Sequence, residues 1–290
     1  MNEPATAPGC DCPFFGTSGM REMSESIHLA VHGAAGRMGR RVVALACKSQ
    51  DFTLTAAVEG STSPLLGQDA GVVAGCEPTG IDLSDHWPDS CHVVIDFSLP
   101  EAIDRCVNEC VERRLPLVVA TTGLSDTQKA GLKKAAISIP IVWAPSMSLA
   151  VNLLMKLSQQ ASRSLKDVQG GLDVEILERH HRHKVDAPSG TALKFGELIA
   201  NELGNDIQHV HGREGETGER SQSEIGYHAI RISDNPGEHT IVFGMMGERI
   251  ELSVAASNRD CYASGALAAA KWLMNKDAGL YNMFDVLGLS

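Results

Sequence analysis

Three glycines spaced three residues apart stand between an apolar run and a segment of helical character. The run His28–His32 is typical of a short buried strand, and the residues from about Arg37 to Lys48 favour a helix. A second strand-like run, Leu54–Val58, ends at Glu59. Strand, glycine turn, helix, strand and acid in this order favour a parallel α/β unit of the dinucleotide-binding type.

The glycine turn, Gly33-Ala34-Ala35-Gly36-Arg37-Met38-Gly39, predicts a phosphate site. Glycine permits a tight turn and close approach of the backbone to a pyrophosphate, and the following helix offers free N–H groups. Glu59 follows Gly39 by 20 residues and can accept hydrogen bonds from a ribose diol. Ala35 stands where a glycine is usual, and its methyl group is small, so we expect a slight shift of the nucleotide. A turn that serves packing alone is the alternative interpretation.

Strands and helices continue to alternate up to about Met147. Pro100 is predicted to open a helix, and Ser125 with Gln128 three residues later forms a capping-box pattern for another. The intervening apolar runs that predict strands are Val93–Phe97, Leu117–Ala120 and Ile141–Trp143. This alternation predicts a doubly wound parallel sheet of the Rossmann type.

The pattern changes after Met147, where consecutive strands appear without helices between them. Such a run of strands predicts an antiparallel or mixed sheet and therefore a second, α+β domain. The expected elements are helices over Leu149–Ser162, Thr191–Leu203 and Tyr262–Asn275, and strands over Asp173–Leu177, Ile225–Ile232, His239–Met245 and Arg249–Ala255.

Charge and cysteine content exclude several classes of protein. The 25 Lys and Arg residues against 36 Asp and Glu residues give a net charge of −11, which disfavours nucleic acid and anionic membrane as partners. No apolar run approaches the roughly 18 residues of a membrane span. Eight cysteines in 290 residues do not form a disulfide scaffold, so we expect a reduced, cytoplasmic protein.

The first 26 residues mix Pro, Gly, Ser and charged residues without an apolar core. We expect residues 1–26 to form a disordered extension without a secretion signal. Cys10 and Cys12 in this segment are weak candidates for a metal site, because no second pair of ligands lies nearby in the sequence. No metal is predicted elsewhere.

A basic cluster follows the apolar run at 174–177. His180-His181-Arg182-His183-Lys184 is followed by Pro188 and by Ser189-Gly190-Thr191, which should open a helix. A helix N-terminus beside a lysine suits a carboxylate, and histidine exchanges a proton near neutral pH. The cluster therefore predicts a site for a small dianion with an acid catalyst beside it. A metal site and a solvated basic loop are the alternatives, and adjacent histidines on a strand, which point to opposite faces, disfavour the metal.

The sequence resembles the dihydrodipicolinate reductase family over about Leu29 to Leu287. The residues that carry the resemblance are the glycine turn at 33–39, Ile95-Asp96-Phe97, Thr121-Thr122-Gly123 and, above all, Glu178-Arg179-His180-His181-Arg182-His183-Lys184-Val185-Asp186-Ala187-Pro188-Ser189-Gly190-Thr191-Ala192. The run at 213–220 and the short motifs at 237–240 and 247–249 resemble further motifs of the family.

The resemblance implies NAD(P)H-dependent reduction of 4-hydroxy-tetrahydrodipicolinate in lysine and diaminopimelate biosynthesis. It implies that His180 is the proton donor or acceptor and that Lys184 is a second catalytic donor facing a substrate carboxylate. His181 and the backbone of Gly190 and Thr191 are then expected to hold the substrate.

The family further implies a homotetramer formed through the open mixed sheet of the second domain, and a C-terminal helix that returns to the first domain. The expected domains are therefore 27–148 with 262–290, and 149–261. The chain then passes between them near Met147–Val151 and Asp260–Ala263, where we expect hinges.

For the cofactor, the resemblance implies a groove lined by the turn from Gly33 to Met38, by Glu59, and by two further runs. These runs are Ala120-Thr121-Thr122 and Ala144-Pro145-Ser146-Met147. NADH is favoured over NADPH, because Glu59 repels a 2′-phosphate and Gly60 follows where many relatives carry an arginine. No Lys or Arg occurs between Lys48 and Arg105, so this stretch offers no cation to a 2′-phosphate. Arg37 of the glycine turn is the cation that could pair with the phosphate instead and allow NADPH to bind. Another amino-acid dehydrogenase and a non-catalytic nucleotide sensor are the rival functions.

Overall fold

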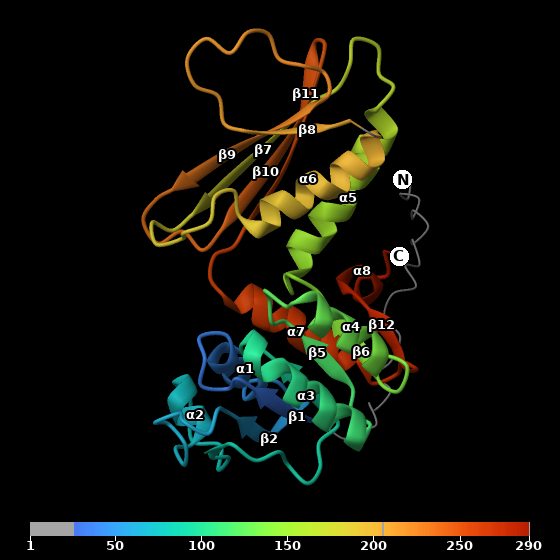
Figure 1. Ribbon diagram of the computed structural model, residues 1–290. Helices are drawn as coiled ribbons and strands as arrows, with labels where there is room; N and C mark the ends of the chain where they lie inside the picture. Colours follow the sequence, from blue (N-terminus) through green and yellow to red (C-terminus); the bar gives the residue numbers. More distant parts are fainter. Residues whose placement is uncertain (1–25, 205, 290) are drawn as a thin grey trace, which may run out of the picture.

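The structure, a computed structural model, describes residues 26–204 and 206–289 (Figure 1). The expectation that residues 1–26 form a disordered extension falls, apart from Ser26, outside the described residues. The Cys10–Cys12 pair also lies outside them. The described chain forms two lobes, one around a seven-stranded sheet and one around a five-stranded sheet. We call these the first lobe and the second lobe.

All neighbouring strands of the first lobe run parallel. Their order is β12-β6-β5-β4-β1-β2-β3, so the chain winds outward in both directions from the centre of the sheet. This confirms the Rossmann-type doubly wound sheet. The strands are β1 (Ile27–His32), β2 (Phe52–Val58), β3 (Leu83–Ser84), β4 (Val93–Asp96), β5 (Leu117–Val119), β6 (Pro140–Trp143) and β12 (Gly279–Tyr281).

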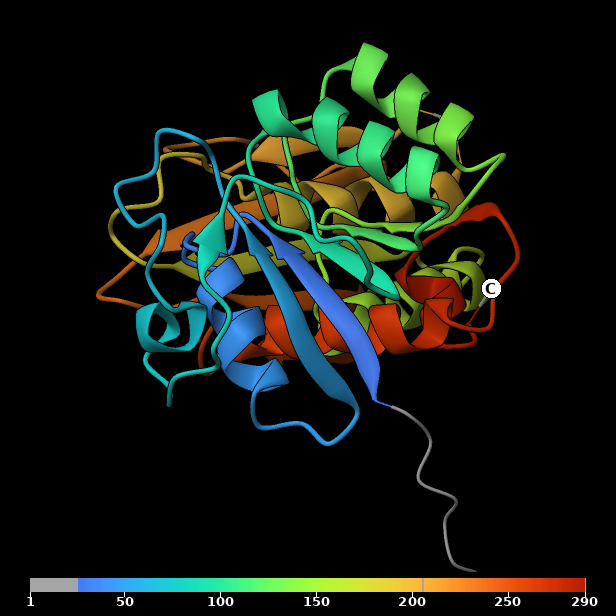
Figure 2. The ribbon, with the colours of Figure 1, turned by 90° about the horizontal axis from the view of Figure 1, so that it is seen from below.

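Helices cover both faces of this sheet (Figure 2). Leu29 and Val31 of β1 pack with α1 and α7, whereas Ala30 between them packs on the other face with α3 and α4. The side chains of β1 on both faces of the sheet are thus apolar at these three positions, as a sheet buried on both sides requires. The helices are α1 (Gly39–Ala46), α2 (Ala70–Ala74), α3 (Pro100–Arg113), α4 (Asp126–Ala135), α7 (Asp260–Leu273) and α8 (Met283–Val286).

Two of these helices begin where the sequence signals predict. Pro100 occupies the first turn of α3, where its missing N–H costs no hydrogen bond. At α4 the capping box forms as expected, with the Ser125 side chain accepting from the backbone of Gln128 and the Gln128 side chain accepting from the backbone of Ser125. Both helices therefore start at the carboxyl side of the sheet's strands.

The second lobe contains a mixed sheet, as predicted. Its order is β11-β10-β7-β9-β8, with β10 antiparallel to both neighbours and β7, β9 and β8 parallel. Helices α5 (Leu149–Leu165) and α6 (Gly190–Leu203) pack on one face over a core that includes Phe195 and Phe243. The strands are β7 (Asp173–His180), β8 (Gln208–His211), β9 (Glu224–Arg231), β10 (Glu238–Met245) and β11 (Glu248–Ala255).

The structure differs from the sequence expectations at several element ends. Helix α1 starts at Gly39 instead of Arg37, because the backbone between 33 and 38 continues as a turn in which Gly36 N–H donates to Gly33 O. Strand β7 extends to His180, where it pairs with β9. The short elements α2, β3, β8 and β12 were not expected, since two to five residues carry too little periodicity to be recognised.

The two lobes are joined by two crossings of the chain and by contacts from the C-terminus. The first crossing leads into α5 at Leu149, and the second follows β11 and ends at Asp260, where α7 begins. Helix α7 returns to the first lobe and packs in its core, as expected. Phe284 of α8 packs against the core of the second lobe. Within the described residues, no helix is both long and apolar enough to cross a membrane.

Candidate active site

Two glycines of the turn, Gly33 and Gly39, lie so close to neighbouring backbone that a side chain is excluded at each. A Cβ at Gly39 would lie 2.1 Å from the carbonyl oxygen of Gly33, and one at Gly33 would lie 2.7 Å from that of Phe97. Gly33 also has a φ of +75°, a conformation that favours glycine. Gly36 is less confined, with a single neighbouring atom at 3.1 Å. The turn therefore presents bare backbone at the N-terminus of α1.

Glu59, at the end of β2, is bound to this turn. One of its carboxylate oxygens accepts from the backbone N–H of Ala35 at 2.8 Å, and the other accepts from that of Gly60 at 3.0 Å. The acid thus stands beside the turn, as a ribose-binding carboxylate must. Its contact with Ala35 shows that it also helps to fix the conformation of the turn.

A cavity of about 960 Å³ opens over the turn and the carboxyl ends of the first lobe's strands. It brings together twelve of the fourteen predicted cofactor residues with Lys184 of the second lobe. These twelve are Gly33, Ala35, Gly36, Arg37, Met38, Glu59, Ala120, Thr121, Thr122, Pro145, Ser146 and Met147. The other two, Ala34 and Ala144, are absent from its lining and are buried in the core beneath it.

The floor of this cavity holds a buried polar cluster that sequence reasoning missed. The Asp96 carboxylate accepts hydrogen bonds from His32 Nδ1 at 2.6 Å, from the Ser98 hydroxyl at 2.6 Å and from the Thr121 hydroxyl at 2.5 Å. These residues stand at or just beyond the ends of β1, β4 and β5. The polar ends of two apolar runs, at His32 and Asp96, were the available signal. The cluster holds Thr121 against the cavity.

Trp87 and Arg105 also line the cavity and were not predicted. Arg105 projects from α3 and donates to the backbone oxygen of Asp85 at 3.0 Å. A cation therefore does lie in the lining that contains Glu59, although the sequence between Lys48 and Arg105 contains none. Only the fold brings Arg105 to this place, because α3 follows β4 and β4 is two strands away from β2.

The basic cluster begins at the end of β7, facing the first lobe. His180 is buried, and its Nδ1 lies 2.5 Å from a carboxylate oxygen of Glu178. Lys184, in the loop after β7, forms an ion pair with Asp186 at 2.8 Å and lines the cofactor cavity. Burial lowers the pKa of His180, and the neighbouring Glu178 carboxylate opposes this effect without cancelling it. His180 therefore exchanges its proton below the usual range of histidine.

Helix α6 begins beside this cluster. The Ser189 side chain caps it by accepting from the backbone N–H of Ala192 at 3.2 Å. Gly190 and Thr191 form the first turn, and a Cβ at Gly190 would meet no atom within 4 Å. The predicted substrate residues of this helix are thus in open surroundings at a helix N-terminus, which favours an anion.

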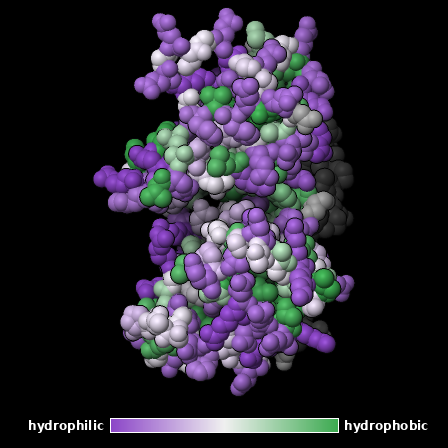
Figure 3. Space-filling model, in the orientation of Figure 1, coloured by the Kyte–Doolittle hydropathy of each residue, from purple (hydrophilic) through white to green (hydrophobic). Residues whose placement is uncertain are grey.

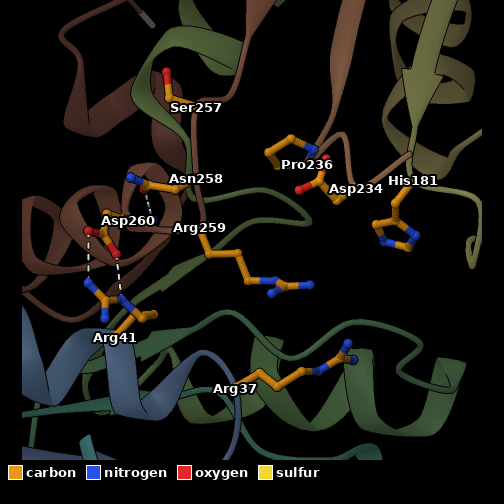
Figure 4. A pocket seen from close by; sticks show the side chains of 9 residues that line it. All are labelled: Arg37, Arg41, His181, Asp234, Pro236, Ser257, Asn258, Arg259 and Asp260. Carbon is orange, nitrogen blue, oxygen red and sulfur yellow. Dashed lines mark hydrogen bonds and ion pairs between the residues drawn. The ribbon is translucent and has the colours of Figure 1, made fainter. Parts of the chain in front are cut away.

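A second cavity of about 540 Å³ lies between the lobes and contains His181 (Figure 4). Arg37 from the turn and Arg259 from the residue before α7 both extend toward the side that carries His181 and Asp234. Arg41 also lines this cavity, but its guanidinium forms an ion pair with Asp260 at 2.6 Å. Figure 3 shows the surface narrowing between the two lobes, with hydrophilic residues around the constriction.

Two models of the dihydrodipicolinate reductase family match the chain. The N-terminal model matches residues 27–147 and the C-terminal model matches residues 150–287. The 4-hydroxy-tetrahydrodipicolinate reductase of Rhodopirellula baltica is 68% identical over 278 residues, which cover 93% of this chain and 99% of the relative. That of Pseudoalteromonas atlantica is 47% identical, covering 90% of this chain and 99% of the relative.

Solved structures support the fold. A dipicolinate-bound dihydrodipicolinate reductase from a Paenisporosarcina species aligns with a TM-score of 0.67 at 24% identity, covering 90% of this chain and 98% of that one. A myo-inositol dehydrogenase from Corynebacterium glutamicum aligns with a TM-score of 0.55 at 15% identity, covering 91% of this chain and 93% of that one. The matches of both halves and the close curated relatives agree with the site geometry, and the chain belongs to the dihydrodipicolinate reductase family.

Proposed function

We propose that this chain is an NAD(P)H-dependent 4-hydroxy-tetrahydrodipicolinate reductase of lysine and diaminopimelate biosynthesis. The observation that carries the proposal is the position of Lys184, which lies in the lining of the cavity formed by the glycine turn and the strand ends. Lys184 of the basic cluster and the nucleotide-binding turn thus line one cavity. The names of the close relatives support the substrate assignment.

The residues of the first lobe fit a dinucleotide. The turn excludes side chains at Gly33 and Gly39, and the ribose-binding acid, Glu59, stands beside it. When bound, a reduced nicotinamide supplies a hydride to the substrate. The turn, the start of α1 and Glu59 would hold the phosphates and the ribose, and the runs at 120–122 and 145–147 would border the reacting end.

The second lobe supplies charge and a proton. A dicarboxylate substrate suits this lobe, since Lys184, His181 and the backbone of Gly190 and Thr191 offer donors to two carboxylates. Reduction of the substrate consumes one proton in addition to the hydride and releases its hydroxyl group as water. His180 provides this proton from the end of β7, and Lys184 orients and neutralises a carboxylate of the substrate.

The cofactor preference is proposed to favour NADH. The two carboxylate oxygens of Glu59 face the turn and Gly60, so a 2′-phosphate would meet a negative charge there. Arg37 and Arg105 are two of the cations in the same lining, and they keep NADPH usable. We further propose a homotetramer formed through the open sheet and a cytoplasmic location. The proposed domains are 27–148 with 262–290, and 149–261.

A coupled assay tests the proposal. The substrate is generated in place by coupling to the preceding synthase, and oxidation of NADH or NADPH is followed by absorbance. We expect oxidation that requires both the synthase and this protein. A nucleotide-sensing protein would bind the cofactor without turnover, and another amino-acid dehydrogenase would oxidise it with a different substrate, so either result would contradict the proposal.

A further inference from the structure

One buried carboxylate contacts several parts of the proposed substrate site. We propose that Glu178 is a positioning residue that sets the tautomer of His180 and joins His180 to the start of α6. The inference rests on the proposed function, because it assigns His180 the proton transfer. Glu178 lies two residues before His180 on β7 and is only 1% exposed.

All hydrogen-bonding positions of the Glu178 carboxylate are used. Oε2 lies 2.5 Å from His180 Nδ1 and accepts from Arg231 Nη1 at 2.8 Å. Oε1 accepts from Arg231 Nη2 at 2.8 Å and from the backbone N–H of Ser189 at 3.1 Å. Arg231 thus binds the carboxylate with both terminal nitrogens, a geometry that fixes its orientation.

This arrangement decides which nitrogen of His180 exchanges a proton. An ionised carboxylate only accepts hydrogen bonds, so Nδ1 of His180 carries hydrogen in both protonation states of the ring. The ring therefore gains its second proton at Nε2, and the imidazolium gives that proton up from the same nitrogen. Nε2 faces Gly237, where a Cβ would lie only 3.0 Å away. A glycine at this position, with a φ of +141°, therefore keeps the reacting nitrogen free of a neighbouring side chain.

Charges from every packed element act on His180. Glu178 and Lys184 belong to β7 and the following loop, Arg231 comes from β9, and His239 comes from β10 with its ring centroid 5.3 Å from that of His180. Burial is the main cause that lowers the pKa of His180, Glu178 raises it, and Lys184 and Arg231 lower it further. Burial lowers the pKa of His239 to about 4, so this ring adds no positive charge near neutral pH.

The same carboxylate connects His180 to the anion site. Its bond to Ser189 N–H holds the residue that caps α6, the helix that presents Gly190 and Thr191. Arg231 also donates to the backbone oxygen of Asp186 at 2.5 Å, and Asp186 pairs with Lys184 at 2.8 Å. The proton donor, the helix start and the loop of Lys184 are therefore held by one Glu178–Arg231 pair.

Strand β7 also offers a matched control. Glu175 is a carboxylate on the same strand that bonds two arginines, Arg213 and Arg220, and a histidine, His228. Burial raises its pKa, but these hydrogen bonds outweigh burial and bring the pKa to about 2. It lies three residues before Glu178 and contacts none of the residues assigned to substrate. Glu175→Gln therefore removes a comparable ion pair without touching the proposed site.

The first test is made on the wild-type protein and needs no activity. With ¹⁵N-labelled histidine at about pH 8, the His180 signals, assigned by their loss in His180→Gln, should show hydrogen on Nδ1. In Glu178→Gln this preference should weaken, and in Glu175→Gln it should persist. Hydrogen on Nε2 in the wild type would overturn the inference, whether or not the reductase assignment holds.

The second test uses the reaction. Glu178→Gln should lower kcat about tenfold or more, because the imidazole loses its orienting acceptor. Removal of the negative charge lowers the pKa of His180. In the pH profile of kcat, the limb that reports His180 should therefore move to lower pH. Glu175→Gln should leave kcat and that limb in place. If the pH limb of kcat and the His180 nitrogen signals are both unchanged in Glu178→Gln, Glu178 serves the fold alone. If the wild-type protein is inactive but its His180 signals are those expected, only the reductase assignment is contradicted.

Discussion

His180 and Lys184 are the residues on which the proposed chemistry depends most. His180→Gln and Lys184→Ala should each lower kcat about 10²-fold or more, the usual size of a general acid–base contribution. The melting temperature should stay nearly unchanged, since glutamine can still donate to Glu178 and Lys184 pairs with the half-exposed Asp186. Steady-state kinetics and thermal melts of both purified variants check this. Wild-type turnover in either variant would remove it from the catalytic assignment.

Cofactor choice is a second prediction at the level of single residues. Gly60→Arg should raise kcat/KM for NADPH relative to NADH by about tenfold, because it places a cation beside the acid that repels the 2′-phosphate. The position accepts a side chain, as a Cβ there would meet no atom within 4 Å.

The measurement is kcat/KM for both cofactors in the wild type and in the variant. Gln68→Arg is a control for added charge, at an exposed residue that does not line the cavity. A strong preference of the wild type for NADPH would contradict the prediction. Arg37→Ala and Arg105→Ala would then show which of these two arginines of the lining binds the phosphate.

Residues at the site could be predicted to different extents. Glu59 and Lys184 were predictable because their positions follow from a turn and from a strand end nearby in sequence. Arg105 and Arg231 were not, because each reaches the site from an element that is distant in sequence and is brought there only by the strand order. Asp96 was recognised as part of a motif, but its bond to His32 depends on the pairing of β1 with β4.

At the level of elements, the packing of α7 against the loop after β6 determines one border of the cofactor cavity. A Cβ at Gly265 would lie 1.7 Å from the carbonyl oxygen of Met147, which lines the cavity. Gly265→Ala should therefore destabilise the protein by about 1–3 kcal/mol, as other overpacked sites do. It should also raise the KM for the cofactor, because the helix and the loop must separate.

Urea unfolding and cofactor kinetics of this variant measure both effects. Gly131→Ala on α4 is the matched control, since its Cβ would meet no atom within 4 Å. Alanine there should stabilise the helix by about 0.5–1 kcal/mol. A Gly265→Ala protein as stable as the wild type would show that α7 and the loop move apart freely.

The long elements could be predicted from sequence because their apolar residues repeat at helical or strand spacing over many positions. Helix α3, with Ile103, Cys106 and Cys110 buried on one face, is an example. Strand β12 has only three residues and joins the sheet edge through pairing with β6, which no local pattern reveals. The start of α1 was misplaced for a related reason, since Arg37 and Met38 suit a helix but the contact of Gly39 with Gly33 keeps them in the turn.

At the level of the whole molecule, we predict that the lobes close when both ligands bind. Asp234 of the second lobe faces Arg37 and Arg259 across the smaller cavity, so closure brings opposite charges together (Figure 4). The first hinge is expected at 147–151. The sequence predicts the second hinge at Asp260–Ala263, but Arg41 binds Asp260 at 2.6 Å and Ala263 is buried in the core of the first lobe. We therefore expect this hinge just before Asp260.

Crystal structures with and without both ligands test closure directly. We expect each lobe to superpose on itself while the angle between the lobes changes, with the dihedral changes confined to the two crossings. Solution scattering should show a smaller radius of gyration only when cofactor and substrate analogue are both present. Structures that superpose as one rigid body would refute closure.

The most direct test of the account is the fate of the cofactor's hydride. Cofactor carrying deuterium at the transferring position of nicotinamide is supplied together with substrate from the coupled synthase, and the product is examined by mass spectrometry. The account predicts carbon-bound deuterium in tetrahydrodipicolinate, at a rate reduced about 10²-fold or more in His180→Gln. A product without deuterium, formed while the protein and cofactor are both present, would contradict it.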